Sequence, residues 1–162
     1  MATGRSTQLT RQIGEHLIVA KLGRLGYIAT PFAGNVPDFD LLIANDEGYS
    51  IPVQVKAING GAWQFQISKF LDVEIVDDVQ YVRDARKLAN PNLVCIFVLL
   101  SEDEKDEFYI FSLKDLQAFF LKTYKGGRRA KNPKSFHCAI LPRDLEQFRD
   151  NWSLIEMSLK SV

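Results

Sequence analysis

Residues 35–59 constrain the fold of this chain more than any other stretch, because they predict two short strands joined by a tight turn. An apolar run, Leu41-Leu42-Ile43-Ala44, follows Asp40 directly. The next four residues have turn chemistry and end on Gly48, which can adopt a positive φ. A second run, residues 50–58, alternates apolar with polar side chains. The segment therefore predicts a β-hairpin whose first strand begins just after Asp40.

The second run carries an amide and an ammonium side chain between apolar residues, which is unusual in a strand that has only a structural role. Gln54 and Lys56 alternate with apolar residues, so their side chains share one face of the strand. If the hairpin pairs in register, Asp40 lies near the far end of the second strand, close to Lys56. We therefore expect a carboxylate, an amide oxygen and an ammonium group to converge at one point of the sheet.

This arrangement resembles the PD-(D/E)xK nuclease superfamily, whose motif is an Asp at the head of one strand and Glu/Gln-x-Lys on the next. Here the motif would be Asp40 with Gln54-Val55-Lys56. The order of elements over roughly the first 60 residues is also similar to archaeal Holliday-junction resolvases and Mrr-like endonucleases. Asp38 completes a literal Pro37-Asp38, but the metal-binding Asp of these enzymes typically leads straight into the apolar strand, as Asp40 does.

The resemblance implies a restriction-endonuclease-like α/β fold, with an αβββαβ core and a mixed sheet flanked by helices, in one domain over residues 1–162. It implies a DNA endonuclease with Mg²⁺ or Mn²⁺ as cofactor, held by Asp40, Gln54 and Glu15. Lys56 would stabilise the charge that develops on the phosphate. Gln54 is neutral where most relatives have a carboxylate, so metal affinity should be weaker. Cutting both strands of a duplex usually needs two active sites, which favours a homodimer.

Two other functions remain open at this stage. A catalytically inactive nuclease fold could bind nucleic acid or protein without cutting, and this alternative is supported by Gln54 in place of a Glu and by the zero net charge. A protein-interaction module is the other, supported by the acidic segment 70–82 and the aromatic C-terminal region. RNA is a second possible substrate beside DNA.

Glu15 has two interpretations. A helix is predicted from an N-cap at Thr10 to about Leu25, and Glu15 falls close to its apolar face. In the resolvase-like relatives a Glu on this helix reaches the metal site. Alternatively, Glu15 is a first-turn acid that favours the helix N-terminus electrostatically. The sequence leaves both open.

A run of six basic residues without an acidic one occupies residues 122–134, which we call the basic segment. It is either a loop that binds a nucleic-acid backbone or a solvated surface loop. The loop before Asp40 offers backbone amides to a substrate phosphate. The residues predicted to contact nucleic acid are Gly34, Asn35, Lys125, Arg128, Arg129, Lys131 and Lys134.

Composition narrows the class of protein. The formal net charge is zero, which counts modestly against a strong non-specific binder of nucleic acid. No apolar run approaches the length of a membrane span and the N-terminus has no signal-peptide core, so we expect a cytoplasmic protein with no membrane partner. Cys95 and Cys138 lie in apolar runs, which predicts reduced core cysteines.

Further along the chain, residues 93–100 predict a buried strand and residues 108–111 its hairpin partner. Helices are predicted over residues 81–89, 113–124 and 143–152. Trp63 and Phe65 are either core aromatics or a platform for stacked bases.

Overall fold

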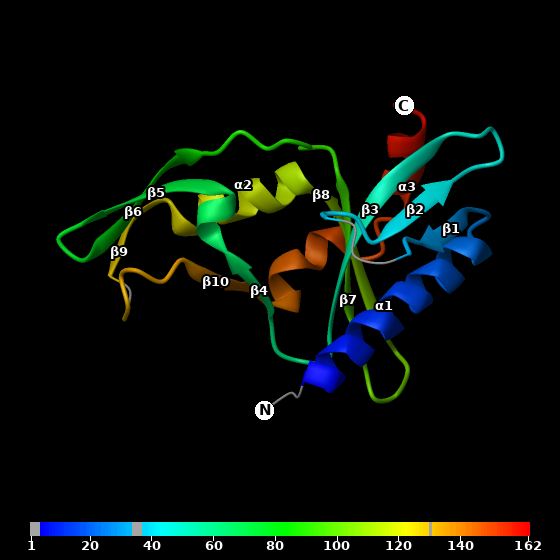
Figure 1. The fold of residues 1–162 in the computed structure, drawn as a ribbon, viewed down its shortest axis with the longest axis horizontal. Coiled ribbons are helices and arrows are strands. Elements are labelled where there is room, and N and C mark those ends of the chain that lie inside the picture. The colour runs from blue at the N-terminus through cyan, green and yellow to red at the C-terminus, as the bar shows by residue number, and fades with distance from the viewer. Residues whose placement is uncertain (1–3, 34–36, 130) are drawn as a thin grey trace. The chain divides into compact units, whose positions relative to one another are not determined.

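The computed structural model describes residues 4–33, 37–129 and 131–162, which form two compact units (Figure 1). Unit 1 comprises Met1–Trp63, Leu93–Phe111 and Leu141–Val162. Unit 2 comprises Gln64–Asn92 and Ser112–Ile140. Each unit has its own set of buried side chains, and each is described separately.

Unit 1 is built on a five-stranded mixed sheet in the order β1-β2-β3-β7-β8. The strands are β1 Ile28–Pro31, β2 Leu41–Ala44, β3 Ser50–Ile58, β7 Val94–Leu99 and β8 Glu107–Ser112. β1, β2 and β3 are antiparallel neighbours, whereas β3 and β7 are parallel. The accompanying helices are α1 Gly4–Arg24, the 3₁₀ helix η2 Pro142–Phe148 and α3 Ser153–Leu159. The predicted α/β class, with a mixed sheet flanked by helices, is confirmed.

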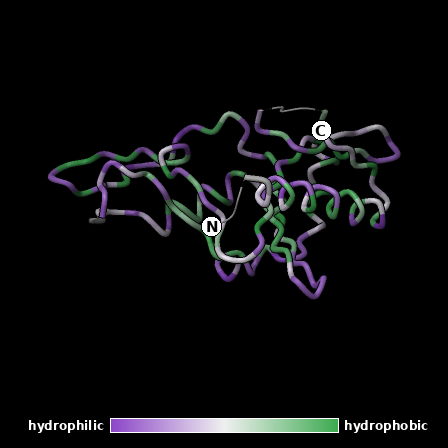
Figure 2. Tube along the Cα trace, turned by 60° about the horizontal axis from the view of Figure 1, so that its bottom comes forward, coloured by the Kyte–Doolittle hydropathy of each residue, from purple (hydrophilic) through white to green (hydrophobic). Residues whose placement is uncertain are grey.

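One face of this sheet packs against α1 and α3. Val53 and Val55 of β3 lie in a common core with Ile18 and Leu22 of α1 and with Ile155 of α3. Figure 2 shows polar and apolar residues mixed along α1, whose buried residues, Gly14, Ile18 and Leu22, recur every four positions as one narrow stripe. Side chains of the opposite parity on β3, including Gln54 and Lys56, therefore lie on the other face.

Gly14 sets how closely α1 approaches β3. A Cβ at this position would lie 2.5 Å from the Cβ of Ala57, the residue after Lys56. No side chain larger than hydrogen fits at that distance, so the helix and strand meet nearly backbone to backbone. This close approach brings the N-terminal half of α1 to the end of the β2–β3 hairpin.

We expect Gly14→Ala to destabilise the protein by about 1–3 kcal/mol, because the added methyl group overlaps Ala57. This loss is expected even though alanine is normally the better helix former by about 1 kcal/mol. Gly23→Ala is the matched control in the same helix, since a Cβ there meets nothing within 4 Å. Urea unfolding of both variants and of the double variant Gly14→Ala/Ala57→Gly measures the effect. Equal stability of the two single variants would contradict this packing.

Unit 2 contains two small sheets and one longer helix. β4 Trp63–Gln66 pairs with β10 His137–Ile140, and β5 Leu71–Val76, β6 Val79–Ala85 and β9 Gly126–Arg129 form a three-stranded sheet. The 3₁₀ helix η1 Ile67–Lys69 joins β4 to β5, and α2 Leu113–Tyr124 follows β8. Ser112 caps α2: its hydroxyl accepts from the Asp115 N–H, and the Asp115 carboxylate accepts from the Ser112 N–H. Phe65, Phe70 and Phe120 make ring contacts in this unit.

Three predictions of secondary structure were wrong. Residues 81–85 of the predicted helix 81–89 belong instead to strand β6, and residues 86–89 are neither helix nor strand. Asp77 and Asp78 both adopt positive φ and turn the chain back into a hairpin with β5. Part of the basic segment is strand β9 rather than loop. In place of the helix over 143–152, the 3₁₀ helix η2 ends at Phe148, residues 149–152 are not helical, and α3 begins only at Ser153.

Other expectations concern buried residues. Trp63 and Phe65 are 2% and 8% exposed, so they are core aromatics and not a stacking platform. Cys95 and Cys138 are buried free cysteines, as expected. Among the residues described, no helix combines the length and the apolar character needed to cross a bilayer.

Candidate active site

The β2–β3 hairpin fixes the position of Asp40. Leu41 pairs with Val53, and the backbone N–H of Asp40 donates to the Val53 carbonyl at 2.9 Å. β2 begins only at Leu41, so the N–H of Val55 lies beyond the reach of that strand. The Asp40 carboxylate takes the place of the missing acceptor, with its Oδ2 2.8 Å from the Val55 nitrogen. The hairpin thus holds this carboxylate beside β3.

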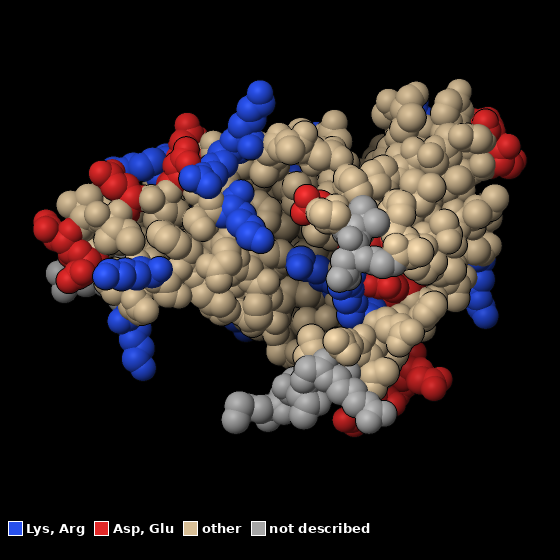
Figure 3. Space-filling model, in the orientation of Figure 1, with Lys and Arg blue, Asp and Glu red and all other residues tan. Residues whose placement is uncertain are grey.

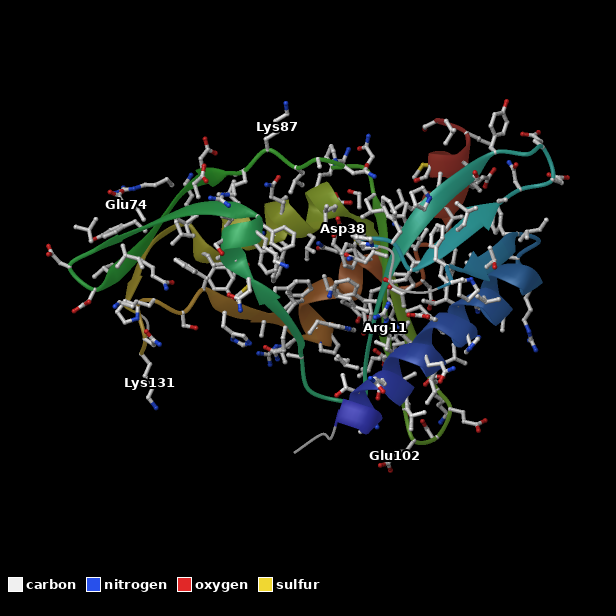
Figure 4. The ribbon with its side chains drawn as sticks, viewed as in Figure 1. Arg11, Asp38, Glu74, Lys87, Glu102 and Lys131 are labelled. Carbon is white, nitrogen blue, oxygen red and sulfur yellow. The ribbon has the colours of Figure 1, made fainter. Side chains whose placement is uncertain are left out.

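Arg11 joins Asp40 to Glu15. Its Nη2 lies 2.7 Å from Asp40 Oδ1 and its Nε lies 2.8 Å from Glu15 Oε1. The two carboxylates are 12% and 18% exposed, whereas the arginine side chain is 56% exposed. Figure 4 shows Arg11 on the side of α1 that faces the hairpin. Two partly buried acids are therefore brought together around one guanidinium.

The position of Glu15 in α1 settles one of its two interpretations. α1 begins at Gly4 and not near Thr10, so Glu15 lies well inside the helix. A role as a first-turn acid at the helix N-terminus is therefore excluded. Glu15 is instead directed toward the end of the hairpin, where it shares Arg11 with Asp40.

Gln54 and Lys56 lie on the adjoining strand. Continuation of the Leu41–Val53 register places Gln54 opposite Asp40, and Lys56 follows two residues later on the same face. Both side chains are partly buried. Lys56 pairs with Phe97 of β7, and the Trp63 indole donates to the Lys56 carbonyl at 3.1 Å. The backbone around the lysine is therefore well fixed.

The literal Pro37-Asp38 pair does not share this geometry. Asp38 is exposed and adopts a φ of 68°, in the turn before the strand. Asp40, by contrast, is tied to β3 through two hydrogen bonds. The structure thus places Asp40 rather than Asp38 at the hairpin junction.

The donor set suits a hard divalent cation. The Asp40 and Glu15 carboxylates and the Gln54 amide offer oxygen ligands of the kind that Mg²⁺ and Mn²⁺ prefer. A single guanidinium already bridges one oxygen of each acid, so both carboxylates contact the same cationic group. The described part of the chain contains no group of three or more Asp, Glu, His or Cys side chains placed to hold a metal. Any ion here would therefore keep several waters.

Arg11 is the residue of this site that the sequence did not predict. Its hydrogen bond to Glu15, and then the negative charge of Asp40, raise the pKa of Arg11 above its ordinary value. The signal available in the sequence was its i,i+4 spacing from Glu15, which is typical of a helical ion pair. The contact with Asp40 crosses from α1 to the hairpin, and no local pattern predicts it.

The fold has a counterpart among solved structures. The chain is similar to the structure of a bacterial homing endonuclease, I-Ssp6803I, with a TM-score of 0.54 and 17% sequence identity, over 96% of this chain and 97% of that chain. The chain therefore shares the overall α/β fold of that structure. No protein-family model matches the sequence, and no curated protein matches it.

The predicted nucleic-acid contacts lie in two places. Gly34 and Asn35 fall outside the described residues. The others belong to unit 2: Lys125 is the C-cap residue of α2, Arg128 and Arg129 are in β9, and Lys131 and Lys134 follow it. Lys125, Lys131 and Lys134 are exposed.

The basic segment is held to β6 rather than hanging free. Gly126 and Gly127 pair with Val82 and Tyr81, and a Cβ at Gly127 would lie 2.7 Å from the Tyr81 ring. Gln80, only 2% exposed, donates through Nε2 to the carbonyls of Pro133 and Ser135 at 2.6 and 2.7 Å. Gly127 therefore allows close packing against Tyr81, whereas Gly126 provides a φ of 97° with open space around it. The described lysines extend from an anchored backbone.

Charge is divided unequally between the two units. The residues of unit 2 include 11 Lys and Arg against 6 Asp and Glu, whereas those of unit 1 include 9 against 14. Unit 2 therefore has an excess of basic residues although the whole chain has a formal net charge of zero. Figure 3 shows Lys and Arg side chains, in blue, spread over the face drawn. A basic unit can attract a nucleic-acid backbone even in a neutral protein.

Proposed function

We propose that the protein is a metal-dependent DNA endonuclease of the PD-(D/E)xK type, with Asp40, Gln54 and Lys56 as its motif. The observation that carries the proposal is the fixed position of Asp40 opposite Gln54, beside Glu15, in a nuclease-like α/β fold. Mg²⁺ or Mn²⁺ is the proposed cofactor, with Asp40, Glu15 and Gln54 as the residues that would hold it. A bound ion of this kind would offset the negative charge of the phosphate and polarise a water.

The side chains divide the work according to their chemistry. Asp40 is the anchoring ligand because the Val55 N–H fixes its orientation. Lys56 contributes a compact positive charge on the same face as Gln54, where it would stabilise the negative charge that develops as water attacks phosphorus. Two such sites are needed to cut both strands, so we propose that a homodimer acts on duplex DNA.

The basic segment is proposed to hold the DNA backbone. We expect the variant in which Lys125, Lys131 and Lys134 are all changed to Gln to bind duplex DNA more weakly. The magnitude of the slope of the log association constant against log salt concentration should fall by about 2–3, because each phosphate contact releases close to one counterion. A matched control changes three exposed cations of unit 1, Arg24, Lys105 and Lys160, to Gln.

Fluorescence anisotropy of a labelled duplex in Ca²⁺, over a range of salt concentrations, measures both triples. An unchanged slope in the first triple, or an equal loss in both, would contradict specific use of this segment.

Cleavage of a panel of labelled duplex, branched and single-stranded DNA, with RNA of the same sequence, tests the proposed activity. We expect at least one DNA to be cut in Mg²⁺ or Mn²⁺ and none in EDTA. If only RNA is cut, the assignment of DNA is wrong. If the folded protein cuts nothing in either metal, the endonuclease proposal fails.

A non-cutting binder is the second candidate, and one observation favours it. Among the described residues, two carboxylates meet near the end of the hairpin, and Arg11 already forms an ion pair with each of them. The same panel separates the two candidates, because a binder would retain affinity for DNA without producing cleaved ends.

A further inference from the structure

We propose that Arg11 is a built-in competitor of the divalent cation: it holds Asp40 and Glu15 together in the metal-free protein, and its displacement sets the metal concentration at which the site fills. This inference rests on the proposed function, since it concerns the same two carboxylates. It adds a regulatory residue that lies outside the Asp40, Gln54 and Lys56 motif.

The contacts show why the arginine and a metal ion exclude each other. Arg11 uses Nη2 for Asp40 Oδ1 and Nε for Glu15 Oε1, at 2.7 and 2.8 Å. The other Asp40 oxygen is committed to the Val55 N–H. A cation that coordinates Asp40 together with Glu15 therefore needs the oxygens that Arg11 occupies, or must lie close to its positive charge. Either arrangement weakens metal binding as long as the guanidinium stays in place.

The burial pattern shows which partner can leave. The carboxylates of Asp40 and Glu15 are mostly buried and belong to fixed elements, the hairpin junction and the middle of α1. The Arg11 side chain is 56% exposed, so it can turn into solvent without opening a core. Without Arg11, two partly buried like charges would face each other unscreened, which is costly until a cation arrives.

Binding of Mn²⁺ alone, followed by the electron paramagnetic resonance signal of the free ion, tests this role without any activity measurement. We expect Arg11→Gln to bind Mn²⁺ at least about tenfold more tightly than the parent, because a positive charge next to both ligands is removed. Arg11→Lys keeps the charge and should lie closer to the parent. Arg24→Gln is the matched control, with the same charge change in the last turn of the same helix, and should stay within about twofold of the parent.

A double-mutant cycle on metal-free protein tests the other half of the proposal. Arg11→Gln should lower the unfolding midpoint in urea, and the loss should be much smaller when Asp40→Asn is also present, because the asparagine no longer needs a counter-ion. Adding Mn²⁺ should then raise the midpoint of Arg11→Gln more than that of the parent.

The outcomes separate the two proposals. If the parent binds Mn²⁺ and Arg11→Gln binds it equally or more weakly, the role of Arg11 is wrong and the metal site stands. If no protein binds Mn²⁺ while the cycle shows coupling, the metal site itself fails and Arg11 is only a structural ion-pair residue. Additive effects in the cycle would also overturn the proposal.

Discussion

Asp40→Asn is expected to lower the rate of DNA cleavage by about a thousandfold or more while leaving the protein folded. Asparagine has the same shape and keeps a carbonyl oxygen that can accept from the Val55 N–H, so the hairpin junction stays intact. What disappears is the negative charge that anchors the proposed cation. Losses of one important electrostatic group at an active site are typically about 10²–10³-fold, and removal of the anchoring ligand should exceed that range.

The control for this experiment lies two residues away. Asp38→Asn removes the same charge from an exposed turn residue, and asparagine tolerates the positive φ found there. We expect that variant to cut at the rate of the parent. The decisive measurement is single-turnover cleavage with Mg²⁺, with unfolding midpoints measured alongside. If Asp38→Asn is inactive and Asp40→Asn is active, the metal ligand has been assigned to the wrong aspartate.

Lys56→Met is expected to reduce cleavage by about 10²–10³-fold without weakening metal binding. Methionine is close in length to the aliphatic part of lysine and suits a partly buried position next to Phe97, so loss of packing should be small. The ammonium group is what the reaction loses, at the step in which charge develops on the phosphate. Mn²⁺ affinity should stay equal or rise, because a nearby positive charge has been removed.

Lys105→Met provides a matched comparison, since Lys105 is exposed and paired with Asp103 far from the motif in the sequence. Cleavage rates and Mn²⁺ affinities should be measured on the same preparations. Loss of both metal binding and activity in Lys56→Met would indicate damage to the site as a whole. Unchanged activity would remove Lys56 from the proposed mechanism.

The parts of the fold that could be predicted from sequence are those fixed by local chemistry. β2 and β3 have the predicted boundaries, because the alternation of apolar residues and the turn that ends at Gly48 act within a few residues. Ser112 and Asp115 likewise predict the start of α2, since both groups of the capping box lie within one turn.

The errors arose where distant contacts decide the structure. Residues 81–85 have no strong local preference, and their pairing with β5 and β9 makes them a strand. α1 extends back to Gly4 although a capping residue is present at Thr10. The basic segment was predicted to be a loop, yet Gly126–Arg129 pair with β6 and Gly127 lies against the Tyr81 ring.

The candidate site shows the same division. Asp40, Gln54 and Lys56 could be proposed from spacing, because a hairpin register follows from turn length. The link from Arg11 to Asp40 spans 29 residues and depends on how α1 docks at Gly14. The contact between Arg11 and Asp40 could therefore not be predicted from local sequence patterns.

Nicking of supercoiled plasmid tests the central claim most directly, with the parent, Asp40→Asn and Lys56→Met compared in Mg²⁺, in Mn²⁺ and in EDTA. The account predicts that the parent converts the plasmid to nicked or linear DNA in at least one metal and not in EDTA, and that both folded variants leave it supercoiled. Cleavage by either variant at the parental rate, or cleavage that persists in EDTA, would contradict a metal-dependent site built on Asp40 and Lys56.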